Sequence, residues 1–202
     1  MMIRRTVIFD LGGVYFSDGT RRAIDKIAAG YGVSRQAVAE FLNGKAGARY
    51  RTGRITVDQF WQQATALWNI QALPETLSTI WCESYRQNRG TVGLVKQLRA
   101  ADHQLLYLSD NTRERVAFLE DKYGFLKNFD DGIFSHRVRL KKPDPRIYER
   151  VLAKALNPAA ACVYIDDKPE YLAPAKQLGM QVIAFKSASQ LEADLKDLAL
   201  LA

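Results

Sequence analysis

The stretch "VIFDLGGVYF" (residues 7–16) begins as an apolar, β-prone run and then meets an acidic residue and two glycines. The apolar part predicts a buried strand over residues 6–10 that ends on Asp10. An Asp before Gly-Gly is by itself ordinary turn chemistry. Asp10 becomes a candidate functional residue only if other parts of the chain bring phosphate-binding, cationic or metal-binding groups to the same place.

The chain after residue 90 alternates helical and strand patterns, and this alternation decides the fold class. The helical patterns cover residues 91–101, 112–124, 144–156 and 169–179, and the strand patterns cover 104–110, 132–135, 161–167 and 180–185. Together with the first strand, this order predicts an α/β fold with a doubly wound, mostly parallel sheet. Right-handed crossovers would bring the strand ends to one edge of that sheet.

Residues 17–89 interrupt the alternation with helical patterns and no convincing strand. These patterns cover residues 21–32, 35–44, 56–69 and 74–88, with Gly44, Gly47 and Gly53 expected to loosen the joints and Trp61, Trp68 and Trp81 expected in a local core. A helical insertion after the first strand is typical of a cap over the strand ends, where open α/β sheets bind ligands. We predict a core of residues 1–16 and 90–202 and an all-helical cap of residues 17–89, with a purely structural subdomain as the alternative.

The composition is that of a globular protein of 202 residues, with 48% hydrophobic and 25% charged residues. The start resembles a secretory signal, but Asp10 interrupts its apolar run and no cleavage site follows. No stretch approaches the ~18 apolar residues of a membrane span. Cys82 and Cys162 are too few for a disulfide framework and are expected to be buried thiols. We therefore expect a cytoplasmic protein with no membrane partner.

The net charge of +7 raises the question of nucleic acid. The basic residues are scattered, and the densest cluster, "RVRLKK" at residues 137–142, is followed by Pro143 rather than by more cations. No recognised nucleic-acid module is visible. We therefore predict no nucleic-acid partner, a small anionic ligand, and a monomer or dimer.

Polar residues follow the predicted strands at the points where these strands end. They are Asp10, the run Ser109, Asp110 and Asn111, Lys142 in a loop, and the pair Asp166 and Asp167. Each alone has an ordinary explanation, such as a helix cap, a loop cation or a turn. Brought to one edge, they would assemble carboxylates for Mg²⁺, a hydroxyl and amides for phosphate oxygens, and an ammonium group to balance charge.

The chain resembles the haloacid dehalogenase-like (HAD) hydrolases through four motifs that occur in the order of that family. Within the family it resembles the phosphatase branch, in which a helical cap is inserted after the first motif. The four motifs are "FDLGGV", "LYLSDN", "KKPDPRIYERVL" and "VYIDDKPEYLAPAKQLGM", and the resemblance spans essentially the whole chain. The resemblance implies a Rossmann-like core. It also implies the activity of a Mg²⁺-dependent phosphatase, that is, of a phosphoric monoester hydrolase. The implied substrate is a small phosphorylated metabolite, with sugar phosphates among those of the branch, and the implied intermediate is an aspartyl-phosphate.

The resemblance also implies roles for residues of the first and fourth motifs. Asp10 would attack phosphorus as the nucleophile, and its carboxylate would also contact Mg²⁺. The carbonyl of Gly12 and the side chain of Asp167 would complete the protein ligands of the metal, with Asp166 either a ligand or directly behind the ligands. The glycines after Asp10 would let the backbone approach a phosphate closely.

The second and third motifs would supply the groups that hold the transferring phosphoryl. Ser109 and the amide of Asp110 would bind its oxygens. Lys142 would neutralise its charge and help to keep Asp10 ionised.

One position departs from the family pattern. The common first motif has a second Asp two residues after the nucleophile, and here that position is Gly12. In the family, that second Asp normally protonates the leaving oxygen and later activates water. General acid–base help of this kind is worth about 10² to 10⁴ in rate. Asp18, Asp110 and His136 are candidate substitutes. A non-catalytic or weakly active HAD-like binding protein, and a 2-haloacid dehalogenase that needs no metal, remain alternatives.

Overall fold

The computed structural model describes residues 4–201, and its centre is a sheet of five parallel strands. The strands are β1 (Thr6–Phe9), β2 (Gln104–Ser109), β3 (Asp131–Phe134), β4 (Cys162–Asp166) and β5 (Gln181–Ala184). Their order is β3-β2-β1-β4-β5, which confirms the predicted doubly wound α/β fold. The chain returns past β1 after β3, so the strand order reverses beside β1, where open α/β sheets bind ligands.

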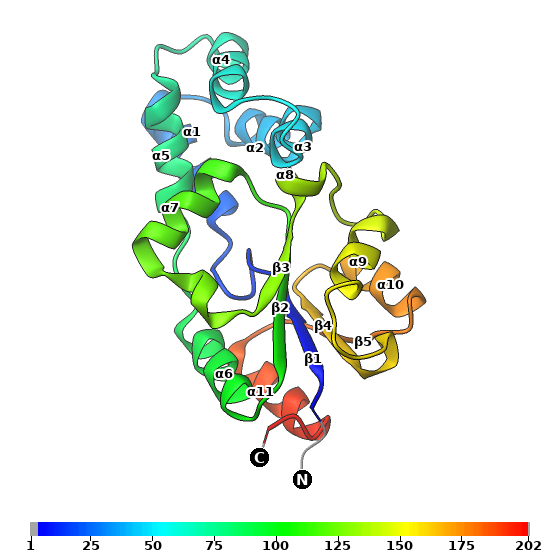
Figure 1. Cartoon of the computed structure of the whole chain (residues 1–202). Coiled ribbons are helices and arrows are strands. Elements are labelled where there is room, and N and C mark those ends of the chain that lie inside the picture. Colours follow the sequence, from blue (N-terminus) through cyan, green and yellow to red (C-terminus); the bar gives the residue numbers. More distant parts are fainter. Residues whose placement is uncertain (1–3, 202) are drawn as a thin grey trace.

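Helices cover both faces of the sheet (Figure 1). Every residue of β1, β2 and β4 is buried, as expected for a parallel sheet between two helical layers. The helices of one layer are α6 (Arg89–Ala100), α7 (Arg113–Tyr123) and α11 (Ala188–Asp197), and those of the other are α9 (Pro145–Leu152) and α10 (Pro169–Gln177). Side chains alternate between the layers, because Val7 and Phe9 pack in one apolar cluster and Ile8 packs in the other.

Five helices lie above the carboxyl ends of the strands (Figure 1). They are α1 (Gly19–Tyr31), α2 (Arg35–Asn43), α3 (Lys45–Arg51), α4 (Val57–Trp68) and α5 (Pro74–Glu83). Phe60 stacks on Tyr50 with ring centroids 4.5 Å apart and lies edge-on to Trp61 at 4.9 Å. Trp61 and Trp81 are buried, as expected for residues of a local core. The exact limits of the cap, at residues 16/17 and 89/90, stay a prediction.

The two segments that link these helices to the sheet are paired with each other. The amide of Ser17 donates to the carbonyl of Arg86 at 2.8 Å, and the amide of Asn88 donates to the carbonyl of Tyr15 at 2.9 Å. The prediction that α5 continues to residue 88 is therefore wrong, since the chain leaves the helix after Glu83 to make these bonds.

Other differences from the predicted elements are local. Helix α3 was not predicted, and Gly47 lies inside it rather than in a joint. A Cβ at Gly47 would overlap the carbonyl oxygen of Leu42, so the glycine permits close packing instead of loosening the chain. Helix α9 ends at Leu152 instead of residue 156, because the backbone tightens into turns there. The remaining elements are α8 (Ser135–Val138) and the short 3₁₀ turns η1 (Phe125–Asn128) and η2 (Ala159–Ala161).

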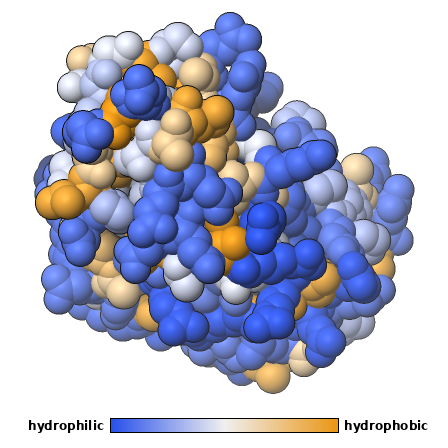
Figure 2. Space-filling model, turned by 90° about the horizontal axis from the view of Figure 1, so that it is seen from above, coloured by the Kyte–Doolittle hydropathy of each residue, from blue (hydrophilic) through white to orange (hydrophobic). Residues whose placement is uncertain are grey.

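The surface above the sheet is mostly hydrophilic, with hydrophobic residues in small groups (Figure 2). Cys82 and Cys162 are both buried and free, which confirms the prediction for them. Within residues 4–201, no helix combines the length and the apolar character needed to cross a bilayer.

Candidate active site

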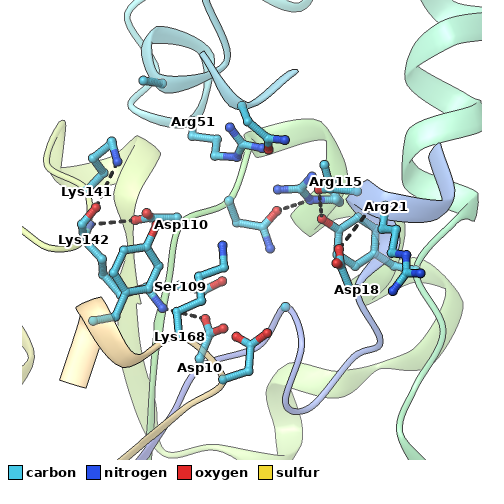
Figure 3. Close-up of a pocket in the computed structure, with 18 of the residues that line it drawn as sticks. Asp10, Asp18, Arg21, Arg51, Ser109, Asp110, Arg115, Lys141, Lys142 and Lys168 are labelled. Atoms are coloured by element: carbon cyan, nitrogen blue, oxygen red, sulfur yellow. Dashed lines mark hydrogen bonds and ion pairs between the residues drawn. The ribbon is translucent and has the colours of Figure 1, made fainter. Parts of the chain in front are cut away.

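A cavity of about 450 Å³ lies between the strand ends and the helices above them (Figure 3). The loops after β1, β2 and β4 contribute to its wall, together with the loop before α9. Asp166 does not line the cavity, because it is completely buried behind the wall. The other residues predicted from the sequence do line it: Asp10, Gly12, Ser109, Asp110, Lys142 and Asp167.

Lys142 connects the predicted site residues. Its side chain is 1% exposed, and Nζ lies 2.8 Å from Oδ1 of Asp10 and 2.6 Å from Oδ2 of Asp166. Nζ also donates to the carbonyl of Leu108 at 3.4 Å, and the backbone amide of Lys142 donates to Oδ1 of Asp110 at 3.1 Å. These bonds hold the ammonium group between the ends of β1, β2 and β4.

The electrostatics of this ion pair follow from its burial. Loss of water raises the pKa of Asp10 to about 7, although the Lys142 charge opposes the rise and Asp166 adds to it. Burial alone would lower the pKa of Lys142, but the charges of Asp10 and Asp166 raise it well above its usual value. Lys142 therefore stays charged and favours the ionised form of Asp10.

The carboxylate of Asp166 makes its hydrogen bonds to other groups of the protein. Oδ2 accepts from Nζ of Lys142 and from the hydroxyl of Tyr164, and Oδ1 accepts from the backbone amide of Lys168 at 2.9 Å. Both carboxylate oxygens are therefore occupied. This arrangement places Asp166 as an anchor for Lys142.

Asp167 has the opposite character. Oxygens of Asp10, Asp166 and Asp167 lie within 4.8 Å of one another, a spacing that can hold a metal ion. Oδ1 of Asp167 is buried and has no hydrogen-bond partner in residues 4–201. A buried carboxylate oxygen without a partner is costly, and a hard cation such as Mg²⁺ would satisfy it. The site thus fits a divalent cation held by Asp10 and Asp167.

Gly13 allows the close approach of the Asp167 carboxylate. A Cβ at this position would overlap the carboxylate, and φ of +106° disfavours any other residue. Glycine at residue 13 is thus required by the packing of the first motif against the fourth.

The second motif places three polar residues at the end of β2. Ser109 is 2% exposed, and the Asp110 side chain faces the Lys142 loop. Burial raises the pKa of Asp110, while the Lys142 charge lowers it. The amide of Asn111 already donates to Oγ of Ser135 at 3.0 Å. The hydroxyl of Ser109 and the amide of Asp110 remain the candidate phosphate-binding groups of this loop.

Tyr85 lies beside the position of the missing acid, and sequence reasoning did not identify it. A Cβ at Gly12 would lie 3.6 Å from Cε1 of Tyr85, and a Cβ at Gly19 would overlap the same ring. The Tyr85 hydroxyl lies 2.8 Å from Oγ1 of Thr20. An aromatic ring in a slot between two glycines therefore stands next to residue 12.

The three candidate substitutes for that acid lie in different places. Asp18 and Asp110 line the cavity that contains Asp10. Asp18 also caps α1, since its Oδ1 accepts from the amide of Arg21 at 3.1 Å. His136 lines a second cavity, and its Nδ1 lies 2.9 Å from the carbonyl oxygen of Asn111.

Two arginines of the cavity wall were also missed. Arg51 comes from α3, which was not predicted, and Arg115 comes from α7. Arg115 is only 2% exposed, and its guanidinium lies 4.7 Å from the ring centre of Trp81 and 4.6 Å from that of Tyr85. The signal available in the sequence was its position one turn before Leu119, on the apolar face of α7.

Sequence comparison finds curated relatives that are named as a phosphatase and as a hydrolase. Sesquiterpene phosphatase astK of Aspergillus oryzae is 24% identical over 184 residues, which are 87% of this chain and 87% of the relative. Flavin mononucleotide hydrolase 1 of Arabidopsis thaliana is 35% identical over 102 residues, which are 50% of this chain and 42% of the relative. The chain spans less than two thirds of the length of several curated relatives.

Comparisons of structure agree on the fold. A HAD-like hydrolase from Porphyromonas gingivalis superposes with a TM-score of 0.80 at 19% identity, covering 98% of both chains. A HAD family enzyme from Bacteroides thetaiotaomicron, solved with magnesium and inorganic phosphate, gives 0.74 at 19% identity over 92% of this chain and 96% of that chain. An L-2-haloacid dehalogenase from Xanthobacter autotrophicus superposes with a TM-score of 0.67 at 17% identity, covering 99% of this chain and 85% of that chain. The fold alone therefore does not separate phosphatase from dehalogenase.

The family is decided by a match that covers most of the chain. The model of the haloacid dehalogenase-like hydrolases matches residues 4–179, which include the first three motifs, the fourth motif up to Gly179, and the helices between the first and second motifs. The chain therefore belongs to the haloacid dehalogenase-like hydrolases.

Proposed function

We propose that this protein is a Mg²⁺-dependent phosphatase that hydrolyses a small phosphorylated metabolite, with sugar phosphates among the candidates. The observation that carries the proposal is the juxtaposition of Asp10, Lys142 and the unpartnered oxygen of Asp167 at one end of the sheet. The phosphatase and hydrolase names of two relatives, and the magnesium and phosphate bound to one structural neighbour, support it.

In the proposed reaction, the carboxylate of Asp10 attacks phosphorus and the leaving oxygen departs with the bonding electrons. This step forms an aspartyl-phosphate, which water then hydrolyses to phosphate and free Asp10. The hydroxyl of Ser109 and the amide of Asp110 hold the phosphoryl oxygens. Lys142 balances their negative charge and favours the ionised form of Asp10 between turnovers.

The metal would be held by Asp10, by the carbonyl of Gly12 and by Asp167. When bound, Mg²⁺ supplies positive charge that offsets the repulsion between an anionic nucleophile and an anionic phosphoryl group. Asp166 supports the site from behind, because its oxygens already accept hydrogen bonds from Lys142, Tyr164 and Lys168. We therefore assign Asp166 to positioning of Lys142 rather than to metal binding.

The acidic cluster favours phosphatase over dehalogenase chemistry. Displacement of a halide by an Asp nucleophile needs no metal, so it supplies no cation to satisfy the buried, unpartnered oxygen of Asp167. Phosphoryl transfer uses both the cation and the carboxylates that bind it.

The test is hydrolysis of an aryl phosphate with Mg²⁺ and with EDTA, alongside halide release from a chloroacid. We expect phosphate release that requires Mg²⁺ and no halide release. Metal-independent halide release would assign the protein to the dehalogenases, and no turnover of either compound would leave a binding protein.

A further inference from the structure

Several cations of the cavity wall have no role in the chemistry proposed at Asp10, and two of them are arginines that lie together on Trp81. Arg51 and Arg115, which we call the arginine side, line the same cavity as Asp10. Figure 3 shows them across the pocket from Asp10, with their guanidinium groups toward the space between. Nη1 of Arg115 is buried and has no hydrogen-bond partner among the described residues. A buried guanidinium donor without an acceptor is costly unless a ligand supplies one.

The contacts of both arginines fix their position without neutralising their charge. Nε of Arg115 donates to Oδ1 of Asn111, and Nη1 of Arg51 donates to the carbonyl of Leu42 at 2.9 Å. Both guanidinium groups lie over the ring of Trp81. Within residues 4–201, no ion pair joins either arginine to a carboxylate.

The two charges also oppose each other. Burial and the neighbouring charge of Arg115 both lower the pKa of Arg51. Two cations that are held in place, unpaired and partly dehydrated form a ready binding site for an oxyanion, because the planar guanidinium binds carboxylate or phosphate through two parallel donors.

We propose that Arg51 and Arg115 bind a second anionic group of the substrate, so that the substrate is a phosphate monoester that also carries a carboxylate or a second phosphate. This inference rests on the proposed phosphatase function, which assigns the first phosphoryl group to Asp10, Ser109 and Lys142. A substrate with an uncharged leaving group would leave Nη1 of Arg115 buried and unsatisfied. A second oxyanion would satisfy it, and its negative charge would offset the repulsion between the two arginines.

The experiment measures binding of non-hydrolysable ligands to the full chain in Mg²⁺ by calorimetry. Phosphonoacetate, phosphonopropionate and phosphonobutyrate carry two anionic groups at increasing separation. Ethylphosphonate, propylphosphonate and butylphosphonate match them in length but carry one. We expect at least one phosphonocarboxylate to bind about ten-fold more tightly than its matched alkylphosphonate, as one additional charged hydrogen-bond pair would give.

Variants assign that preference to the arginines. Arg51→Gln and Arg115→Gln should each reduce the preference to about three-fold or less, because the second anionic group loses a charged partner that the alkylphosphonate never engages. Arg49→Gln, an exposed position on the same helix as Arg51, is the matched control and should leave the preference intact. If Arg115→Gln does not fold, as judged by its thermal melt, the partly exposed Arg51 still provides the test.

Two results would overturn the inference: no preference at any chain length, or a preference that survives in every folded arginine variant. A preference that depends on the arginines supports it even if aryl phosphate hydrolysis fails, since the chain would then be a non-catalytic binder of such anions. Mg²⁺-dependent hydrolysis without any preference would leave the phosphatase function standing and remove the second anionic site.

Discussion

The two sides of the cavity arrange their charges in opposite ways. On the strand-end side, which we define as Asp10, Lys142, Asp166 and Asp167, Nζ of Lys142 lies within 2.8 Å of two carboxylates. On the arginine side, the guanidinium groups lie on aromatic rings and no carboxylate pairs with them in residues 4–201. Charges paired within the protein fix the geometry of reacting groups, whereas unpaired charges retain the capacity to bind a ligand.

The most severe test of the strand-end side is Asp10→Asn. We expect this variant to lose all measurable turnover, because an amide cannot attack phosphorus. The measurement is Mg²⁺-dependent hydrolysis of an aryl phosphate by the purified variant. Asp121→Asn, an exposed position on α7, serves as the control and should keep full activity. If Asp10→Asn retained a tenth of wild-type activity, Asp10 would not be the nucleophile.

The absence of an acidic side chain at Gly12 predicts that the rate depends strongly on the leaving group. Without an acid at residue 12, the departing oxygen must carry its own negative charge. Across a series of phosphate monoesters of rising leaving-group pKa, kcat/KM should fall. The total fall should be about 10² to 10⁴ larger than for an enzyme that has such an acid. Acyl, aryl and anomeric sugar phosphates should be the good substrates. A flat series would show that another acid operates, and Asp18→Asn and Asp110→Asn would then identify which of these two cavity residues acts.

Lys142→Met tests whether the buried ion pairs of the strand-end side stabilise the fold. It leaves Asp10 and Asp166 buried without their cation, and we expect a loss of about 3 kcal/mol in the free energy of unfolding. The matched control is Lys154→Met, which breaks an exposed pair with Asp131 and should cost less than about 1 kcal/mol. Urea denaturation of both variants measures the difference. Equal losses would contradict a special contribution of Lys142.

Asp167→Asn tests the metal separately from the nucleophile. We expect the affinity for Mg²⁺ to fall about ten-fold or more, because a hard cation prefers an anionic oxygen. Activity should return as the Mg²⁺ concentration rises, in contrast to Asp10→Asn. Calorimetric titration with Mg²⁺ gives the affinity directly. An unchanged Mg²⁺ affinity would remove Asp167 from the ligand set.

The smallest expected effect is a movement of residues 17–89 relative to the sheet. The chain crosses between them twice, and the crossings are joined by hydrogen bonds of Ser17 and Asn88. Such a paired crossing can bend as one hinge, and closure would exclude water from the phosphoryl site. Phosphate with Mg²⁺ should slow hydrogen exchange in the helices above the cavity and slightly reduce the radius of gyration in X-ray scattering. No change in either quantity would contradict closure.

The difference between the two sides also separates what could be predicted from the sequence. Asp10, Ser109, Lys142 and Asp167 were predictable because each follows a strand whose apolar pattern is local, and parallel strands place their carboxyl ends together. Arg51 was missed because its helix contains Gly47, a residue that disfavours a helix in isolation. The packing of that glycine against Leu42 outweighs the propensity.

The sequence by itself determined the family, the parallel sheet and the residues that meet at its edge, since these depend on hydrophobic periodicity and on motifs within short segments. Only the tertiary structure decided that Asp166 binds Lys142 while Asp167 keeps an unpartnered oxygen. It also decided that Arg115 lies against Trp81 in the cavity wall. The physical reason is that these contacts join side chains from separate segments, so burial and pairing are fixed only when the helices pack above the strand ends.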